Sequence, residues 1–484
     1  MEAPKQEVLT APELPPMVLM LPSPGMGHLI PMIEFAKRIP LHQNLHITFV
    51  LPNAGPPSKA QTTVLQSLPN SISHTFLPPV TFTDLPPNTK TETLISLTVL
   101  LSLPSLRQTI HSLSVSHTIT TLLVDHFGTD AFDVAGEFNL PKYIFYPSTA
   151  MSLSLFLYLP RLDQEVHCEY RELTEPVKIP GCIPVHGKDL LNPVQDRKND
   201  AYRTVLRNAK RHSEADGIIE NSFLELEPGP IKELQKGKPV LYPVGPLVNR
   251  EVEVAQAGPN CSECLKWLDD QPDKSVLFVS FGSRGTLSSN QTIELALGLE
   301  KSEQRFLWVV RSPYDKVVNA SYFTAESDSD PFDFLPNGFL ERTKGRGFVT
   351  SSWAPQPQVL AHGSTGGFLT HCGWNSVLES IVNGMPLVVW PLYAEQRMNA
   401  VILTEGVKVG LRPNVGESGL IERQEIASVV KCLMEGEEGK KLRCKMKDLK
   451  EAAAKTLGEN GTSTNTISKL ALKWSNSNKS NVTN

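Results

Sequence analysis

The feature that most constrains the fold is an alternation of short apolar runs with amphipathic stretches of helical period. In the first half, strands are expected at 17–23, 46–51, 121–126 and 143–146, with a helix over 28–39. The second half repeats the pattern, with strands expected at 275–280, 306–310, 347–351, 367–370 and 387–390. Strand-length runs that alternate with helices are typical of βαβ units and parallel sheets. The sequence therefore predicts an α/β fold with two parallel sheets.

The length of the chain, 484 residues, indicates two or three domains, because a single hydrophobic core rarely organises so many. The boundary is expected at 242–246, since the letters YPVGP can neither extend a helix nor occupy a central strand. A second irregular stretch, 312–338, is rich in Asp, Ser and Pro and is expected to form a long surface insertion. The expected divisions are a disordered N-terminus (1–16), a first domain (17–245), a second domain (246–460), a C-terminal helix that packs back toward the first domain (461–476) and a disordered tail (477–484).

Charge and composition exclude several classes of protein. The formal net charge is −5 and no long basic run occurs, so a broad electrostatic footprint for nucleic acid or anionic lipid is missing. The longest apolar candidate, 148–159, is too short for a membrane span, and the N-terminus lacks the apolar block of a secretory signal. The seven cysteines include one C-x-x-C pair without a second pair at zinc spacing. We expect a cytoplasmic monomer with reduced thiols and without bound metal, nucleic-acid partner or stable membrane insertion.

The first predicted strand leads into the turn PSPGMGH at 22–28, and a helix follows at once. Such a turn lies at the carboxyl edge of a parallel sheet, where doubly wound folds bind ligands. A dinucleotide fingerprint is rejected, because Ile30 stands where its third glycine belongs and the second strand ends in Leu-Pro-Asn without an acid for a ribose. The turn instead presents His28 at a helix N-terminus, where the dipole favours a neutral, basic imidazole. A general base is one interpretation of His28, and a histidine hydrogen-bonded in a tight turn is the other.

Asp125 closes a later predicted strand at the same edge, so a parallel sheet can bring it beside His28. A carboxylate there would hold the imidazole tautomer and stabilise the imidazolium. The alternative is an acid that caps the helix starting near Thr129, and Asp130 and His126 are competing partners. A hydrolase triad has no support, because neither GSRG nor GSTG has the G-x-S-x-G spacing.

A second ligand site is expected after the strand at 367–370, where the letters HCGWNS open a helix. Backbone N–H groups and the positive end of the helix dipole point at one spot there, so an anion should bind. His371, Asn375 and Ser376 add side-chain donors that suit a pyrophosphate. Glu379, one turn further on, can accept hydrogen bonds from ribose hydroxyls.

Two purely structural interpretations remain open for the same stretch. Ser376 and Glu379 have the S-x-x-E spacing of a capping box, which explains both residues without a ligand. Trp353 and Trp374 suit a hydrophobic core equally well.

The 44 residues from Trp353 to Gln396 resemble the signature box of plant secondary-metabolite UDP-glycosyltransferases. Their letters are WAPQPQVLAHGSTGGFLTHCGWNSVLESIVNGMPLVVWPLYAEQ. The resemblance covers nearly the whole chain except its tails, and it includes the segments PGMGHLIP, VDHFGTD and SFGSRGTLS. Within the family, the chain is most similar to the phenol, or hydroquinone, glucosyltransferase group.

The resemblance implies a GT-B architecture, in which two Rossmann-like domains face each other across a cleft. The first domain then binds the acceptor and the second binds UDP-glucose, with His28 as the catalytic base and Asp125 as its partner. The implied nucleotide contacts are Trp353 stacked on the uracil, Ala354 through its backbone, and Gln356 and Glu379 at the ribose. The implied phosphate and sugar contacts are Ser283, His371, Gly373, Asn375 and Ser376 at the phosphates, Trp374, Glu395 and Gln396 at the sugar, and Ser148 or Thr149 as a further sugar contact. The residues expected to line the acceptor pocket, because they adjoin these positions, are Met26, Phe127 and Tyr393.

The function implied by the resemblance is an inverting, metal-independent transfer of glucose from UDP-glucose to a hydroxyl of a small aromatic acceptor. The helix that opens at Gly373 would neutralise the departing UDP. In the family, a Gln at the last position of the box, here Gln396, indicates glucose rather than galactose as the donor sugar. Glu395 stands where the family frequently has Asp, and it keeps the carboxylate. Two alternatives remain open: a nucleotide-sugar-binding protein without transferase activity, and a glycosyltransferase for a non-phenolic acceptor.

Overall fold

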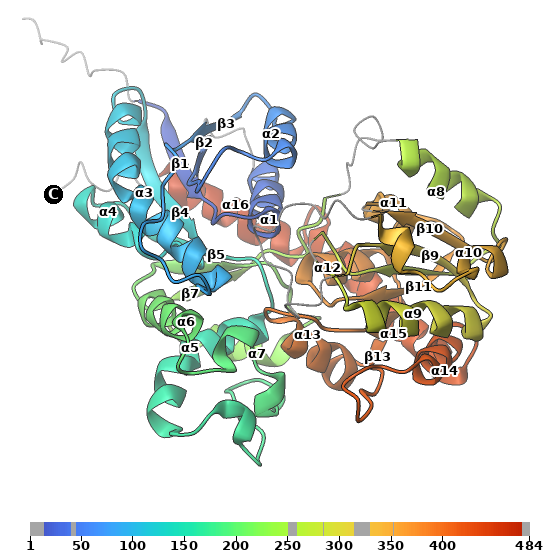
Figure 1. Ribbon diagram of the computed structural model, residues 1–484. Helices are drawn as coiled ribbons and strands as arrows, with labels where there is room; N and C mark the ends of the chain where they lie inside the picture. The colour runs from blue at the N-terminus through green and yellow to red at the C-terminus, as the bar shows by residue number, and fades with distance from the viewer. Residues whose placement is uncertain are drawn as a thin grey trace, which may run out of the picture.

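Two parallel β-sheets organise the chain, one in each half. The computed structural model describes residues 14–39, 45–249, 259–283, 285–313, 330–351 and 353–476. The blue-to-green first domain occupies the left of Figure 1, and the yellow-to-red second domain occupies the right. The predicted α/β fold with two Rossmann-like domains is confirmed.

The first sheet has the strand order β3-β2-β1-β4-β5-β6-β7. Its strands are β1 (Pro16–Leu21), β2 (His46–Leu51), β3 (Ile72–Phe76), β4 (Thr118–Asp125), β5 (Lys142–Tyr146), β6 (Gly217–Glu220) and β7 (Val240–Pro243). Its helices are α1 (Met26–Arg38), α2 (Lys59–Gln66), α3 (Thr91–Leu113), α4 (Ala131–Glu137), α5 (Ala150–Glu165), α6 (Asp200–His212) and α7 (Pro228–Leu234). Five of the six residues of β1 are buried, because helices cover both faces of the sheet, and this explains its unbroken apolar sequence.

The second sheet has the strand order β10-β9-β8-β11-β12-β13. Its strands are β8 (Val276–Ser280), β9 (Arg305–Val310), β10 (Gly347–Ser351), β11 (Thr365–Thr370), β12 (Leu387–Val389) and β13 (Gly410–Leu411). Its helices are α8 (Pro259–Asp269), α9 (Ser289–Ser302), α10 (Phe339–Arg342), α11 (Gln356–Ala361), α12 (Trp374–Asn383), α13 (Gln396–Val401), α14 (Arg423–Met434) and α15 (Glu437–Leu457).

The last helix, α16 (Thr462–Ser475), leaves the second domain and packs on β1, β4 and β7 of the first sheet (Figure 1). The Trp474 ring contacts the rings of Phe35 and Tyr143, with centroids 6.2 and 5.4 Å away. At the start of the helix, the Ser463 hydroxyl donates a hydrogen bond to the Gly245 carbonyl at 2.6 Å. The end of the chain therefore ties the two domains together.

Four strands were not predicted from the sequence, namely β3, β6, β7 and β13. Strands β6, β7 and β13 have four residues or fewer, which is too short to show a period, and the letters of β3, ISHTF, are half polar. Pro243 fits in β7 because that strand lies at the edge of the sheet.

Three predicted segments fall largely outside the described residues. Residues 1–13 of the N-terminus, residues 314–329 of the predicted insertion and the tail at 477–484 are not described. The described end of the insertion contains the short helix η6 (Pro331–Phe334), which packs against α9.

Among the described residues, one helix, α3, is long and apolar enough by length and composition alone to cross a membrane. This helix packs against α4 and α6 and buries one stripe that includes the polar residues Ser96, Thr98 and Ser102. The longest apolar stretch identified from the sequence, 148–159, lies instead in and before α5. Helix α3 is therefore a packed helix of the first domain.

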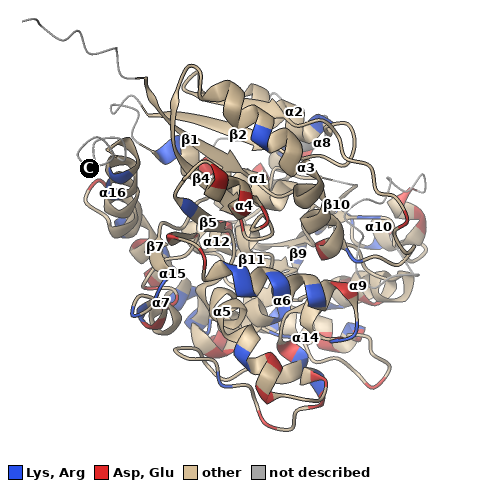
Figure 2. Ribbon diagram, turned by 90° about the vertical axis from the view of Figure 1, so that its left-hand side faces the viewer, with Lys and Arg blue, Asp and Glu red and all other residues tan. Residues whose placement is uncertain are grey.

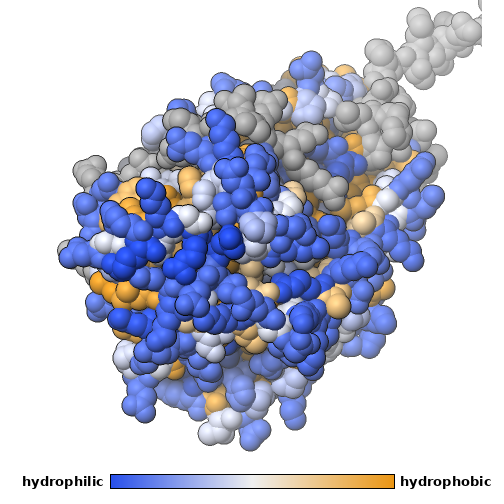
Figure 3. Space-filling view, turned by 90° about the vertical axis from the view of Figure 1, so that its right-hand side faces the viewer, coloured by the Kyte–Doolittle hydropathy of each residue, from blue (hydrophilic) through white to orange (hydrophobic). Residues whose placement is uncertain are grey.

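The visible surface carries both signs of charge. Acidic and basic residues are interspersed along the helices in Figure 2, and the face shown in Figure 3 is mostly hydrophilic with small, separate hydrophobic areas. The cysteines whose side chains the structure describes are free thiols.

Candidate active site

Both sheets reverse their strand order beside the first strand of their domain. Strand β1 lies between β2 and β4, and β8 lies between β9 and β11. In open α/β sheets, the loops at the carboxyl ends of the strands diverge at such a point and leave a crevice for a ligand. The segments that follow β1, β4, β8 and β11 carry most of the residues that the sequence singled out.

The structure brings His28 and Asp125 into direct contact. His28 lies in the first turn of α1, whose N-cap is Gly25, and Asp125 is the last residue of the neighbouring strand β4. Nδ1 of His28 is 3.0 Å from Oδ2 of Asp125, and both side chains are buried. The backbone N–H of Phe127 donates to the other carboxylate oxygen at 3.2 Å. The carboxylate therefore fixes the imidazole, with Nδ1 as donor and Nε2 as the nitrogen that can accept a proton.

Electrostatics keep this carboxylate ionised. Burial by itself would raise the pKa of Asp125, but the neighbouring imidazoles of His28 and His126 and the hydrogen bond with His28 lower it to about 2. Burial also lowers the pKa of the adjacent His126 to about 3, so that ring is neutral at pH 7.

The alternatives for Asp125 do not fit the structure. Helix α4 begins at Ala131 with Asp130 as its N-cap residue, so Asp125 does not cap it. Asp130 instead pairs with Arg207 at 2.9 Å and with Arg211 at 3.5 Å. His28 makes the shorter contact with Asp125, while Nε2 of the competing His126 lies 4.0 Å from the other carboxylate oxygen.

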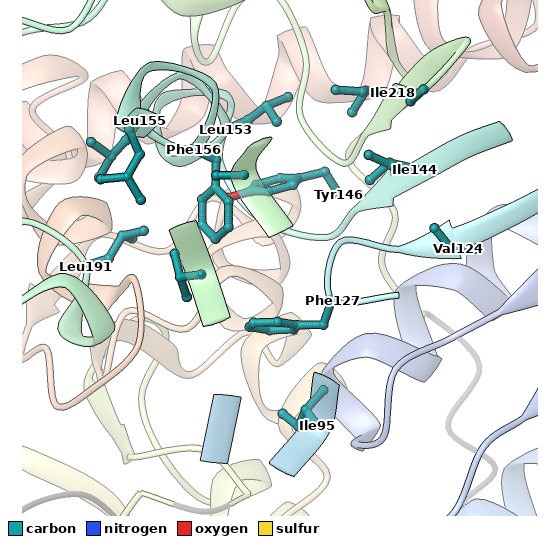
Figure 4. Close-up of a cluster of buried hydrophobic side chains, with 14 of the residues drawn as sticks. Ile95, Val124, Phe127, Ile144, Tyr146, Leu153, Leu155, Phe156, Leu191 and Ile218 are labelled. Atoms are coloured by element: carbon teal, nitrogen blue, oxygen red, sulfur yellow. The ribbon is translucent and has the colours of Figure 1, made fainter. Parts of the chain in front are cut away.

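The three residues expected to line the acceptor pocket lie in different surroundings. Phe127 presents its ring edge-to-face to His28, with centroids 5.8 Å apart, and belongs to the buried cluster of Tyr146 and Phe156 shown in Figure 4. Met26 is partly exposed and packs on the cluster around α1. Tyr393 comes from the second domain, where its ring centroid is 6.5 Å from that of His371.

The second ligand edge, at the carboxyl ends of β8 and β11 in the second sheet, is built mainly from backbone. Helix α12 starts at Trp374 with Gly373 as its N-cap, and no side chain caps it. The first N–H groups of such a helix have no partner within the helix, so they and the dipole suit an anion. Gly282, with φ +75, and Gly373 enclose the His371 ring so tightly that a Cβ atom on either would lie 2.6 or 2.4 Å from it. Only glycine allows this arrangement.

His371 is buried and neutral. Burial, with a further contribution from the charge of Arg311, lowers the pKa of His371 to about 4. Its Nδ1 atom is buried and has no hydrogen-bond partner in the structure. A buried polar atom without a hydrogen-bond partner lowers stability, so this nitrogen is suited to form a hydrogen bond with a ligand.

A small polar network lies beside the start of α12. Nε2 of Gln356 donates to Oγ of Ser376 at 2.9 Å and to Oε2 of Glu379 at 2.6 Å. Burial raises the pKa of Glu379 to about 7. The capping-box interpretation is wrong, because Ser376 is the third residue of the helix and not its N-cap.

The two tryptophans of the box lie in opposite environments. Trp353, after β10, is 45% exposed, so the core interpretation is wrong for this residue, while the next residue, Ala354, is buried. Trp374 is 3% exposed and belongs to the second-domain core. Its indole N–H donates to the carbonyl of Asn221 in the first domain at 2.7 Å. The Trp374 side chain is therefore a core and interdomain contact, and only its backbone N–H remains available at the helix start.

The remaining candidates surround this edge. Ser283 is exposed in the turn after β8, and Asn375 is partly exposed in the first turn of α12. Oε1 of Gln396 accepts hydrogen bonds from the backbone N–H groups of Leu392 and Tyr393, both at 2.9 Å, and so shapes its own loop.

Ser148 and Thr149 have different roles in the fold. The Ser148 hydroxyl donates to Oε1 of Glu395 across the domain boundary at 3.0 Å. The Thr149 side chain is fully buried and accepts a hydrogen bond from the Ser152 backbone as the N-cap of α5. Of the two, Ser148 is the residue that reaches the second domain.

Sequence reasoning missed two first-domain residues that contact the second domain. The backbone N–H of Asn192 donates to the Ala394 carbonyl at 2.8 Å, and Asp189 pairs with Arg412 at 2.8 Å. Both come from a first-domain segment with short 3₁₀ turns, where no periodic pattern signals a contact with another domain.

Comparisons with known proteins identify the family of the chain. The hydroquinone glucosyltransferase of Rauvolfia serpentina is 60% identical over 464 residues, which cover 95% of this chain and 98% of that protein. UDP-glycosyltransferase 72B1 of Arabidopsis thaliana is 61% identical and covers 95% of this chain and 96% of its own length.

A solved structure described as a complex between a UDP-glucosyltransferase from Polygonum tinctorium capable of glucosylating indoxyl and 3,4-dichloroaniline is also similar. It has 54% identity and a TM-score of 0.88, covering 96% of this chain and 99% of that one. UGT2 of Phytolacca americana, complexed with UDP-2-fluoro-glucose and pterostilbene, has 52% identity and a TM-score of 0.87, covering 95% of this chain and all of that one. The profile of the family described as UDP-glucuronosyl and UDP-glucosyl transferase matches residues 239–449. The chain therefore belongs to this family of UDP-glycosyltransferases.

Proposed function

We propose that this UDP-glycosyltransferase moves glucose from UDP-glucose to the hydroxyl of a small phenolic acceptor, with His28 as general base. The observation that carries the mechanism is the 3.0 Å contact between His28 and a buried, ionised Asp125 at the ligand edge of the first sheet. The substrate class is supported by the relative named hydroquinone glucosyltransferase and by the solved relative that holds a sugar-nucleotide analogue and pterostilbene.

The proposed reaction is one direct displacement. Nε2 of His28 takes the proton of the acceptor hydroxyl while its oxygen forms a bond to the anomeric carbon of glucose. The bond from that carbon to UDP breaks at the same time, and UDP leaves with the electron pair. Asp125 stabilises the imidazolium that forms. Attack from the face opposite to the leaving group inverts the anomeric carbon.

The donor site in this proposal lies along the second ligand edge. Trp353, exposed beside the start of α11, would stack on the uracil, with Ala354 offering its backbone. The acidic network of Gln356 and Glu379 would hold the ribose. The phosphates would take the N–H groups at the start of α12, Nδ1 of His371, and the hydroxyls of Ser283 and Ser376, with Asn375 beside them. Glu395 and Gln396 would bind the glucose.

In this proposal the reaction needs no metal ion, because backbone N–H groups and the helix dipole supply the positive field at the phosphates. A chelator is then expected to leave turnover unchanged. Inhibition by chelator that magnesium reverses would contradict this part of the proposal. The expected location in the cytoplasm and the expected monomeric state belong to the same proposal, and gel filtration tests the second of them.

Phenols suit this site better than aliphatic alcohols. The apolar ring of Phe127 lies edge-on to His28, and a phenol has a pKa of about 10, which brings its proton within reach of a neutral imidazole. An aliphatic alcohol is a much weaker acid and gains less from the same base. An aniline nitrogen can attack in the same geometry, so some N-glucoside is expected.

The test is incubation of the purified chain with UDP-glucose and a panel of phenols, anilines and aliphatic alcohols, with products identified by mass spectrometry. Hydroquinone is expected to give a glucoside, and UDP release is expected to depend on the acceptor. Rapid turnover of an aliphatic alcohol without any hydroquinone product would overturn the phenolic assignment. UDP binding without transfer to any acceptor would favour a nucleotide-sugar-binding protein without transferase activity.

A further inference from the structure

Three side chains with metal-binding atoms converge at the ligand edge of the first sheet, namely His28, Asp125 and His126. One ligand atom from each lies within 4.8 Å of the other two. Nδ1 of His28 is 3.0 Å from one carboxylate oxygen, and Nε2 of His126 is 4.0 Å from the other. Two imidazoles and a carboxylate suit zinc, whose bonds of about 2.0–2.2 Å place tetrahedral ligands roughly 3.3 Å apart. The three atoms, which lie within 4.8 Å of one another, must approach by at most about 1.5 Å to reach this spacing.

The proposed function gives two of these residues a direct part in proton transfer, and His126 takes no part in that step. The His126 side chain is 12% exposed, and its Nδ1 atom is buried without a hydrogen-bond partner. Its ring packs against Phe127, Tyr146 and Phe156, with centroids 4.0, 5.1 and 5.5 Å away. An aromatic hydrocarbon ring would fill this place without leaving polar atoms unsatisfied. The packed imidazole therefore keeps its Nε2 atom 4.0 Å from Oδ1 of Asp125.

We propose that this cluster binds a zinc ion and that the bound ion stops glucose transfer. The inference rests on the proposed role of His28. An ion coordinated to Nδ1 of His28 uses the electron pair of that nitrogen, so the single proton of the neutral ring moves to Nε2. Nε2 then has no electron pair with which to take the acceptor proton. UDP binding continues, because the second domain supplies no ligand to the cluster.

The kinetic test uses the full chain with UDP-glucose and hydroquinone, and adds zinc chloride followed by a chelator. Turnover is expected to fall at least about tenfold and to return when the chelator removes the ion, whereas magnesium, which prefers oxygen ligands, has no effect. His126→Phe fills the same space without a nitrogen, and relative to its own zinc-free turnover it is expected to need about 10- to 100-fold more zinc for half inhibition.

A matched control removes two exposed thiols of the described part of the chain. Cys168 and Cys444 are exposed thiols, and the double variant Cys168→Ser with Cys444→Ser is expected to remain as sensitive to zinc as the parent chain. Zinc inhibition that survives His126→Phe, or that disappears in the cysteine variant, overturns the proposal.

Cobalt(II) gives a measurement that does not depend on activity. The parent chain is expected to produce the visible absorption of a tetrahedral cobalt site, and both His126→Phe and Asp125→Ala are expected to lose it. A chain that transfers glucose normally but shows no such absorption has no metal site, whatever the role of His28. Cobalt binding without loss of turnover overturns the inhibitory role and also contradicts the assignment of His28 as the base.

Discussion

The two ligand edges of this molecule use different chemical groups: the first uses side chains and the second mainly backbone. At the edge of the first sheet, two buried side chains, His28 and Asp125, touch directly and one of them carries a charge. At the edge of the second sheet, glycines expose the start of α12 and the nearby histidine is neutral. Proton transfer requires matched side chains, whereas anion binding can be carried by backbone N–H groups. This comparison favours the proposal that the first domain carries the chemistry and the second domain binds the donor.

Each domain contributes side chains to the hydrophobic core of the other. Met398, Val401 and Ile402, from the second domain, pack into the core of the first, and Phe223 and Leu226, from the first domain, pack into the core of the second. Each domain therefore helps to fix the position of the opposite edge. Variants at one edge should still be separable from variants at the other by comparing turnover with UDP affinity.

The largest effect is expected from His28→Ala, which removes the base and leaves the second edge intact. Turnover should fall about 10²- to 10⁴-fold, while UDP affinity measured by calorimetry stays within about twofold. His74→Ala, at an exposed histidine on β3, serves as the control and should behave like the parent chain. Retention of more than about a tenth of the turnover in His28→Ala would contradict the assignment of the base.

A smaller loss is expected from Asp125→Asn, because the base remains but the amide can stabilise the wrong tautomer. Turnover should fall about 10²-fold, again with UDP affinity unchanged. Asp130→Asn is the matched control, since this acid pairs with Arg207 and Arg211 rather than with His28. If the two variants lose turnover equally, the partner of His28 has been assigned wrongly.

At the second edge, a substitution that shifts the backbone is expected to weaken UDP binding. In Gly373→Ala the new Cβ would lie 2.4 Å from Nε2 of His371, so the loop must shift at the start of α12. Overpacking of about 1–3 kcal/mol corresponds to a loss of roughly 5- to 150-fold in UDP affinity. Gly27→Ala, at the first edge, meets nothing within 4 Å and should leave UDP affinity unchanged. Weak UDP binding in Gly27→Ala or normal binding in Gly373→Ala would remove the contrast between the edges.

Sequence reasoning reached the fold and the position of both edges because these depend on short-range patterns. Apolar runs marked the central strands, and the rule for parallel sheets placed His28 and Asp125 at the same edge. The pairing itself was undecided from the residues, since Asp130 and His126 lie within five residues of Asp125 and only the three-dimensional arrangement separates them. The resemblance to a family, not the periodicity, favoured Asp125.

Long-range contacts account for what the sequence could not reveal. The spacing of Ser376 and Glu379 fits a capping box, but Gly373 starts the helix one turn earlier, and Glu379 bonds to Gln356 instead. The Trp374 indole bonds to a carbonyl 153 positions away in the other domain. Partners at such separations leave no local pattern.

The smallest effect is expected from pH acting on Glu379. Burial raises the pKa of this carboxyl to about 7, so it is about half protonated near neutrality. Ribose hydroxyls donate hydrogen bonds, which favour the ionised form, so binding below pH 7 carries the extra cost of removing the proton. The affinity for the nucleoside should therefore rise with pH between 6 and 8, by at most about tenfold for a single group with this pKa. Calorimetry with uridine measures this change of affinity with pH, because uridine carries no phosphate that titrates in the same range.

Glu379→Gln tests whether this carboxyl is the source of the pH dependence. The amide cannot titrate, so the affinity of the variant for uridine should be the same at pH 6 and pH 8. His371 and Asp125 cannot produce the change, because their pKa values of about 4 and about 2 lie below this window. A parent chain whose uridine affinity does not vary with pH, or a variant that keeps the variation, would show that Glu379 does not hold the ribose. The proposed donor site would then lose its acidic ribose contact and depend more on the backbone of α12, which would sharpen the contrast between the two edges.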